Sequence, residues 1–178
     1  VETTLFDCAL SLLHPHAANF FVSGRVPPRT GNAHPNITPY DTVHTATVPV
    51  FLAVGNDRQF ARLCECIDAA ALVQDPRFTS NALRNANRHE LMALLARQMR
   101  ERDGHELAQT LMQAGVPCSP VLDVAQAVAH PHALATGRIV ELADYRGIAS
   151  PITLERTPAS YRLPPAQLQP ATGGAAPA

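Results

Sequence analysis

Residues 41–67 read DTVHTATVPVFLAVGNDRQFARLCECI, and this stretch decides the class of fold. It contains two short runs of β-branched and apolar residues, 41–46 and 49–55, followed at once by a helix signal. Asn56 and Asp57 are residue types that cap helices. Apolar residues then recur at helical spacing, at Phe60, Leu63, Cys64 and Ile67. A strand pair that leads directly into an amphipathic helix predicts a domain of mixed helix and sheet.

The connection between the two runs is unusual for a hairpin. Only Thr47 and Val48 separate them, and two-residue hairpin turns favour Asn-Gly or Asp-Gly because both positions take positive φ. β-branched residues resist that conformation. The turn is therefore either longer than two residues or strained.

Helices dominate the chain around this stretch. Upstream, residues 2–22 have a helical pattern that Pro15 should kink or restart. Downstream, residues 75–78 break the chain, and helices are expected to begin at Asn87 and near Asp103. Their inward positions are Leu91, Leu94, Leu95 and Met99 in the first, and Leu107, Leu111 and Met112 in the second. Further on we expect an extended segment over 116–122, a helix over 123–129 and a strand over 139–142.

The charge of the chain excludes several functions. Fourteen cations, all arginine, face fifteen anions, so the net charge of −1 argues against a nucleic-acid partner. Without lysine there is no Schiff base, no Walker-type phosphate lysine and no pyridoxal anchor.

The longest apolar run, 48–54, is too short to span a bilayer, and nothing resembles a signal peptide. We expect a cytoplasmic protein with no membrane partner.

The cysteines and histidines give little support to a metal site. Cys64 and Cys66 diverge on a helix, and no second close pair completes four ligands. We expect all four cysteines to be ordinary buried thiols. The His-Pro-His triplets at 14–16 and 130–132 cannot place two histidines one helical turn apart, because proline interrupts the helix. No metal ligand is assigned.

The proline-rich stretch 23–40 is the candidate functional segment. Eighteen residues without regular structure are uncommon inside a compact domain, and such loops are usually functional or disordered. Gly31 and Asn32 tolerate positive φ, so their N–H groups can form a small anion-binding concavity. His34 and Tyr40 can add polar contacts. The alternative is a surface loop that wraps a neighbour. The candidate site residues are Gly31, Asn32, Ala33, His34, Pro35 and Tyr40.

The order of the motifs resembles class III coenzyme A transferases, the CaiB/BaiF group. The resemblance covers about residues 1–165 and rests on an ordered set of short pieces rather than on any one of them. The pieces are Gly31-Asn32-Ala33-His34-Pro35, Pro39-Tyr40, Ala53-Val54-Gly55-Asn56-Asp57, Gln59-Phe60, Leu63-Cys64, Asp75-Pro76-Arg77-Phe78, Asn81, Arg84, Asn87-Arg88, Glu90-Leu91, Gly115-Val116-Pro117-Cys118-Ser119-Pro120-Val121, Pro151 and Pro164-Pro165.

This resemblance implies an α/β fold in which a small α+β domain accompanies fragments of a Rossmann-like large domain, incomplete in this chain. Residues 1–40 would belong to the large domain as a helix and active-site loop. Residues 41–130 would form the small domain, 131–163 would return to the large domain, and 164–178 would be a disordered tail. The family forms interlocked dimers, so a homodimer is expected.

The resemblance also implies the chemistry. Family members move coenzyme A from an acyl-CoA, such as succinyl-CoA, to a small carboxylic acid through an aspartyl anhydride and an aspartyl-CoA thioester. No cofactor is needed beyond the CoA thioester substrate. The family's aspartate precedes the part that matches this chain, and none of Asp7, Asp41, Asp57 or Asp75 matches its motif. No catalytic residue is therefore assigned here, and the chain alone is expected to be inactive.

Two departures and two alternatives accompany this interpretation. Relatives usually carry Asp-Gly where Thr47-Val48 stands, and a Leu-Gly-Gln-His-like signature after Pro164-Pro165, which this chain lacks. The family's mobile glycine-rich loop, which covers the active site, corresponds to 31–40 but is poorer in glycine here.

The Gly-Asn-x-His-Pro and Gly-Asn-Asp features favour a transferase for dicarboxylates. A 2-methylacyl-CoA racemase and a non-catalytic dimerisation remnant are the alternatives.

Overall fold

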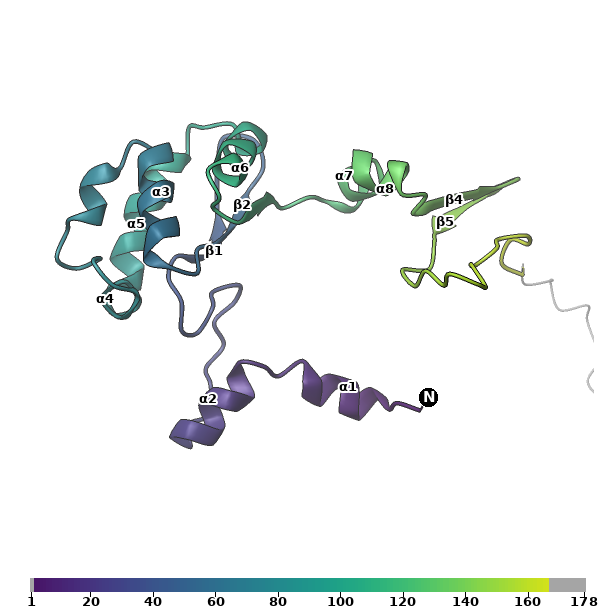
Figure 1. Ribbon diagram of the computed structural model, residues 1–178, viewed down its shortest axis with the longest axis horizontal. Coiled ribbons are helices and arrows are strands. Elements are labelled where there is room, and N and C mark those ends of the chain that lie inside the picture. The colour runs from purple at the N-terminus through teal and green to yellow at the C-terminus, as the bar shows by residue number, and fades with distance from the viewer. Residues whose placement is uncertain (1, 167–178) are drawn as a thin grey trace, which may run out of the picture. The chain divides into compact units, whose positions relative to one another are not determined.

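The computed structural model describes residues 2–166, which fall into two compact units, Val1–Val121 and Leu122–Ala178 (Figure 1). The first unit holds a three-stranded sheet with its helices, and the second holds two short helices and a two-stranded sheet. The domain boundaries expected at 40 and 130 stay predictions. The expected disordered tail lies outside the described residues from position 167 onward.

The strand pair expected from the sequence is present in the first unit. β1 (Tyr40–Val43) pairs with β2 (Val50–Ala53), and β2 pairs with β3 (Cys118–Pro120), all antiparallel. The register sets Val43 opposite Val50, so six residues connect β1 to β2 and the connection is not a two-residue turn. Side-chain hydrogen bonds shape the longer loop, since the Thr45 hydroxyl donates to the Val48 carbonyl at 2.6 Å.

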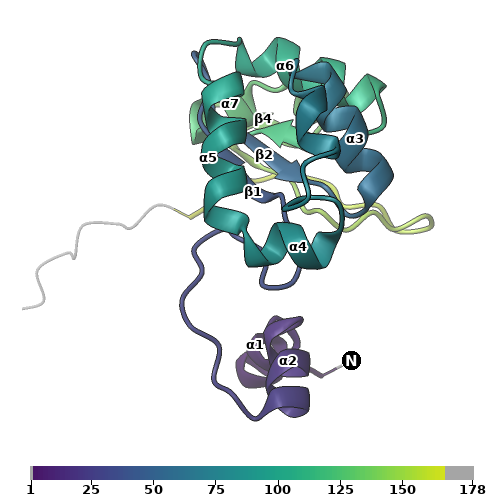
Figure 2. The same cartoon turned by 90° about the vertical axis from the view of Figure 1, so that its left-hand side faces the viewer.

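Three helices pack with the sheet, and Figure 2 shows α3 and α5 in front of β1 and β2 with α6 above them. α3 (Asp57–Cys66) begins at Asn56, whose side chain accepts from the Gln59 N–H. α5 (Arg88–Met99) and α6 (Gly104–Gln113) follow at the expected places, and Asp103 caps α6. The hydrophobic core between helices and sheet includes Val43, Val50, Leu52, Phe60, Leu63, Ile67, Phe78, Leu91, Leu95, Met99, Leu107 and Leu111.

One expectation about this core needs correction. Met112 is exposed rather than inward, because it follows the buried Leu111 by one residue and so points about 100° away around α6. Leu94 is half-buried and packs against the core. Between α3 and α5 the structure adds two elements that the pattern did not predict, a 3₁₀ helix (Ala70–Val73) and α4 (Asn81–Ala86). Ser80 caps α4 by accepting from the Leu83 N–H.

The N-terminal helices are exposed. Pro15 separates α1 (Leu5–Ser11) from α2 (His16–Ser23), as the sequence indicates, and Gly24 ends α2 in a left-handed conformation. Neither helix has a buried residue. Cys8 is therefore exposed, and of the four thiols only that of Cys64 is buried, which corrects the expectation of four buried cysteines.

The second unit begins with α7 (Val124–Val128), where Asp123 and Gln126 form a capping box. α8 (Pro131–Ala135) was not predicted. The strand expected over 139–142 is β4 (Ile139–Leu142), and it pairs antiparallel with β5 (Tyr145–Ile148) through a true two-residue connection. Across the described residues, no helix combines the length and apolar character that crossing a bilayer requires.

Candidate functional site

The sheet of the first unit has two different faces. Residues directly opposite one another share a face, so Val43, Val50 and Leu52 point toward the helices and are buried. The alternate residues, Tyr40, Thr42 and Phe51, point away from the helices and are half-buried. The candidate loop packs on this second face.

Contacts from the loop to the sheet are aromatic and polar. The His34 ring lies against the Tyr40 ring with 5.0 Å between centroids, and Tyr40 meets Phe51 edge-on at 5.5 Å. The Asn32 amide donates to the Thr42 hydroxyl at 3.2 Å. The His34 N–H donates to the Tyr40 carbonyl at 3.0 Å, which folds the loop back on β1. The structure thus brings Asn32, His34 and Tyr40 together.

His34 is held as a neutral ring. Its Nδ1 accepts from the Asn36 N–H at 3.1 Å, so the neutral imidazole carries its proton on Nε2. Burial lowers the pKa of His34, and the positive charge of Arg88 and the neighbouring His16 and His14 lower it further. The ring can therefore donate a hydrogen bond from Nε2 near neutral pH without adding a positive charge.

The remaining predicted residues form the exposed part of the loop. Gly31 has φ of +63° and no atom within 4 Å of where a Cβ would stand. Of the two residues expected to tolerate positive φ, Gly31 takes it and Asn32 does not, and the anion-binding concavity stays a prediction. Ala33 instead closes a turn, donating its N–H to the Thr30 carbonyl at 3.2 Å. Pro35 is half-buried and links this turn to the anchored part of the loop.

A polar stripe on α4 and the start of α5 anchors residues 34–39, and sequence reasoning did not assign it to the site. Asn81 bonds both the Thr38 N–H, at 3.2 Å, and the Asn36 carbonyl, at 2.9 Å. Arg84 donates to the Thr38 carbonyl at 2.9 Å. The stripe consists of Asn81, Arg84, Asn85 and Arg88. Its i, i+3, i+4, i+7 spacing is the signal that would have found it, because such residues share one helical face.

Arg88 is the second cation beside the loop. Its Nη2 donates to the His34 carbonyl at 2.6 Å and to the Asn85 side-chain oxygen at 2.5 Å. Within residues 2–166 no carboxylate pairs with it. The base of the loop therefore carries a half-buried positive charge with no carboxylate partner among these residues, an arrangement that favours an anionic ligand nearby.

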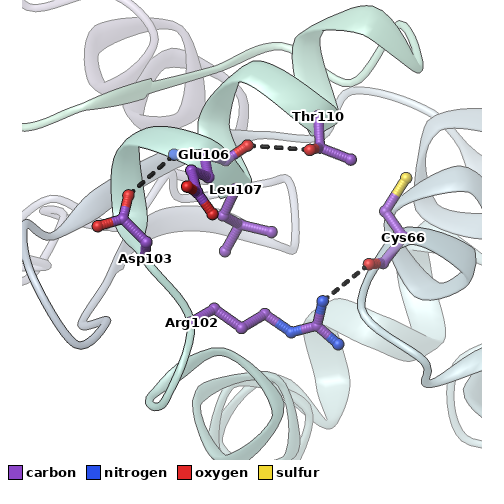
Figure 3. Close-up of a pocket in the computed structure, with 6 residues that line it drawn as sticks. All are labelled: Cys66, Arg102, Asp103, Glu106, Leu107 and Thr110. Atoms are coloured by element: carbon purple, nitrogen blue, oxygen red, sulfur yellow. Dashed lines mark hydrogen bonds between the residues drawn. The ribbon is translucent and has the colours of Figure 1, made fainter.

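The first unit has several hollows, of which two bear on the site. A groove of about 600 Å³ adjoins Gly31 and is lined by Leu13, His16, Pro27, Pro28, Arg29, Thr30 and Gly31. A smaller pocket of about 230 Å³ lies where α6 begins, beside Cys66 (Figure 3). In it Arg102 donates to the Cys66 carbonyl at 3.2 Å, and the pocket shares no residue with the candidate loop. The part of the chain that the structure describes has no group of three metal-binding side chains.

Comparison with known proteins decides the family. A sequence profile described as CoA-transferase family III matches residues 1–172. The chain belongs to CoA-transferase family III. The resemblance found in the sequence motifs is thereby confirmed.

Individual CoA-transferases of the family are clearly related to this chain. It is 33% identical over 173 residues to a succinate–glutarate CoA-transferase of Agrobacterium fabrum, covering 94% of this chain and 43% of that protein. It is 33% identical over 141 residues to an acetyl-CoA:oxalate CoA-transferase of Acetobacter aceti, covering 79% and 36%. The chain spans less than half the length of either relative.

A solved structure confirms the fold. A CaiB/BaiF family protein from Brucella suis superposes with a TM-score of 0.76 and 36% sequence identity, covering 87% of this chain and 41% of the other. The predicted class, a mixed helix-and-sheet fold of CaiB/BaiF type, is therefore correct.

Proposed function

We propose that this protein transfers coenzyme A between an acyl-CoA, such as succinyl-CoA, and a small dicarboxylic acid. The observation that carries the proposal is the 33% identity, over 94% of the chain, to a succinate–glutarate CoA-transferase. The electrostatics of the loop are consistent with it, because Arg88, which pairs with no carboxylate of residues 2–166, places positive charge at the base of a loop that would face carboxylates. The substrate thioester supplies the CoA, and no further cofactor is proposed.

The loop residues Gly31, Asn32, Ala33, His34, Pro35 and Tyr40 are proposed to border the reacting groups. During CoA transfer, water must be kept from the thioester and from any acyl anhydride, because hydrolysis of either would lose the activated acyl group. A loop that closes over these groups excludes water. His34 would donate from Nε2 to a carbonyl or carboxylate oxygen, since its Nδ1 is already occupied. The nucleophilic carboxylate is not assigned to any residue of this chain.

The exposed N-terminal helices support the expected homodimer. Leu5, Phe6, Phe21 and Val22 are 92%, 71%, 81% and 91% exposed, which is far more apolar surface than isolated helices of a monomer usually leave to water. We propose that the protein works as a cytoplasmic homodimer in which these helices are covered.

The direct test incubates the intact protein with succinyl-CoA and either glutarate or oxalate, and measures the new acyl-CoA by mass spectrometry. We expect glutaryl-CoA or oxalyl-CoA to accumulate while succinate is released in equal amount. Release of free CoA without a new thioester would contradict transfer. Deuterium uptake at the α-carbon of a 2-methylacyl-CoA, in heavy water and without transfer, would show the racemase chemistry instead.

Gly31→Val tests the loop within this reaction. The site has room for the side chain, but a β-branched residue at φ of +63° costs about 1–2 kcal/mol of backbone strain. We expect turnover to fall severalfold, by more than the loss of stability accounts for, because the strain falls on the loop that is proposed to border the reacting groups. Gly31→Asn is the control, since asparagine tolerates this conformation. Loss of activity only in proportion to stability would mean that the loop is packing rather than part of the site.

A further inference from the structure

The candidate loop is fixed unevenly along its length. Its second half, residues 34–40, is tied to the folded core by its backbone: the N–H groups of His34 and Thr38 and the carbonyls of His34, Asn36 and Thr38 all have partners. The Pro39 carbonyl also accepts from the Val54 N–H at 3.2 Å. Thr38 is 1% exposed. This half is part of the scaffold.

The first half, residues 25–33, has none of these ties. Within the described residues, its backbone hydrogen bonds stay local, from Arg25 to the Ser23 hydroxyl at 3.2 Å and from Ala33 to Thr30. No side chain in it is buried, and its one bond to the sheet is that of Asn32 to Thr42. A segment with few buried contacts and solvent-exposed amides is the kind that opens at low free energy.

Arg88 lies at the point where the two halves meet. It is the first residue of α5, so its backbone is fixed by the helix, and its Nη2 reaches the His34 carbonyl, the Asn85 side chain and, at 3.5 Å, the Ile37 carbonyl. Charged donors make the stronger hydrogen bonds. The bond to His34 holds the backbone immediately after Ala33, the last residue of the loosely held half.

We propose that Arg88 is a positioning residue that fixes His34 as the pivot about which residues 25–33 open and close over the substrate site. The identity of that site rests on the proposed transferase function, but the pivot itself does not. Closure moves 25–33 and leaves His34, Tyr40 and their aromatic contact in place. The moving part is then shorter than the loop, and its hinge lies between Ala33 and His34.

Hydrogen exchange of the intact protein tests the division of the loop without any substrate. We expect the amides of His34, Asn36 and Thr38 to exchange at least about tenfold more slowly than those of Thr30, Gly31 and Asn32. Equal exchange rates across residues 25–40 would overturn the proposal.

Arg88→Ala tests the pivot, with Arg97→Ala as the matched control on the same helix, because Arg97 is exposed and makes no hydrogen bond or ion pair among the described residues. We expect Arg88→Ala to speed exchange of the His34 amide by about tenfold or more and Arg97→Ala to leave it unchanged. Arg88→Lys, which keeps the charge but not the planar fork, should fall between them. Unchanged His34 exchange in Arg88→Ala would overturn the pivot.

A histidine titration by NMR separates positioning from general destabilisation. Burial and the charges of Arg88, His16 and His14 all lower the pKa of His34, and the Tyr40 ring packs against it. Removing the Arg88 charge should raise the pKa of His34, whereas the control Arg97→Ala should leave the pKa of His34 unchanged. An unchanged pKa of His34 would show that Arg88 does not act on it.

In the enzyme assay, Arg88→Ala should raise the ratio of acyl-CoA hydrolysis to transfer, because a loosened pivot admits water. If Arg88→Ala only unfolded part of the protein, the rates of hydrolysis and transfer would both fall and their ratio would stay the same. That result would contradict a positioning role for Arg88. If no variant, including the unmodified protein, transfers CoA, the proposed function fails while the exchange results still decide the pivot.

Discussion

Arg84 shows how one side chain connects three segments. It is 1% exposed and donates to the Thr38 carbonyl at 2.9 Å, to the Phe78 carbonyl at 3.0 Å and to Asp57 at 2.6 Å. Its guanidinium also lies 4.5 Å from the centre of the Phe60 ring. A buried charge is tolerated only when it is paired and hydrogen-bonded, and Arg84 meets both conditions.

We predict that Arg84→Ala lowers the free energy of unfolding by about 3–5 kcal/mol, because it leaves two buried carbonyls without donors and removes packing against Phe60. The measurement is the urea midpoint at constant m-value. Arg62→Ala, at an exposed position of α3, is the control and should change stability by less than about 0.5 kcal/mol. A loss below about 1 kcal/mol in Arg84→Ala would show that the buried bonds contribute little.

The β1–β2 connection and α6 form a close pair of elements. The Gly104 N–H, in the first turn of α6, donates to the Thr47 hydroxyl at 2.9 Å. A Cβ at Gly104 would stand 2.3 Å from the Val48 carbonyl oxygen and 2.7 Å from the Thr45 hydroxyl. The helix can approach this loop so closely only because residue 104 has no side chain.

Gly104→Ala is therefore expected to destabilise the first unit by about 1–3 kcal/mol, although alanine is the better helix former by about 1 kcal/mol. The nearest atom is backbone, which cannot rotate away as a side chain would. Thermal unfolding measures the effect. Gly55→Ala is the matched control and should be near neutral, because a Cβ there meets only the Gln59 side chain at 3.5 Å. Equal melting temperatures for the two variants would contradict the close approach.

Across the whole molecule, the free cysteine thiols differ in burial, and their burial shows which parts of the chain are packed. Cys64 is fully buried in the core of the first unit, and burial raises its pKa to about 12. Burial likewise raises the pKa of the half-buried Cys118 to about 11, and its thiol donates to the Ala108 carbonyl. Cys8 is exposed on α1. Only the thiolate is nucleophilic, so reactivity should follow exposure and pKa together.

We predict that iodoacetamide at pH 8 labels Cys8 first, Cys118 slowly and Cys64 only on unfolding. Raising the pH to 9 increases the thiolate fraction at every site, but Cys64 remains protonated because pH 9 is still far below its pKa of about 12. Fragmentation mass spectrometry of tryptic peptides gives the rates and separates Cys64 from Cys66, which share the peptide of residues 63–77, and urea-unfolded protein is the control. Rapid labelling of Cys64 in the folded protein would contradict the described core, and an unreactive Cys8 would show that α1 is covered in the assembled protein.

Much of the fold could be read from local chemistry in the chain. Asn56 caps α3 as expected, helices begin at the expected places after Asp103 and Asp123, and Pro15 separates two helices, because capping and the missing proline N–H act within one turn of the backbone. The burial of Phe60, Leu63, Cys64 and Ile67 follows in the same way from helical spacing. The ordered motifs were also sufficient to identify the family.

Contacts between remote residues decided the rest. The six-residue β1–β2 connection is held by a hydrogen bond from the Gly104 N–H, 57 positions after Thr47. The exposure of Cys8 depends on what the rest of the fold leaves uncovered. In the candidate site, local residue types indicated His34 and Tyr40. Only the tertiary structure placed the stripe of Asn81, Arg84, Asn85 and Arg88 against residues 34–38, more than 40 positions away, because helical spacing shows that residues share a face but not which distant segment that face contacts.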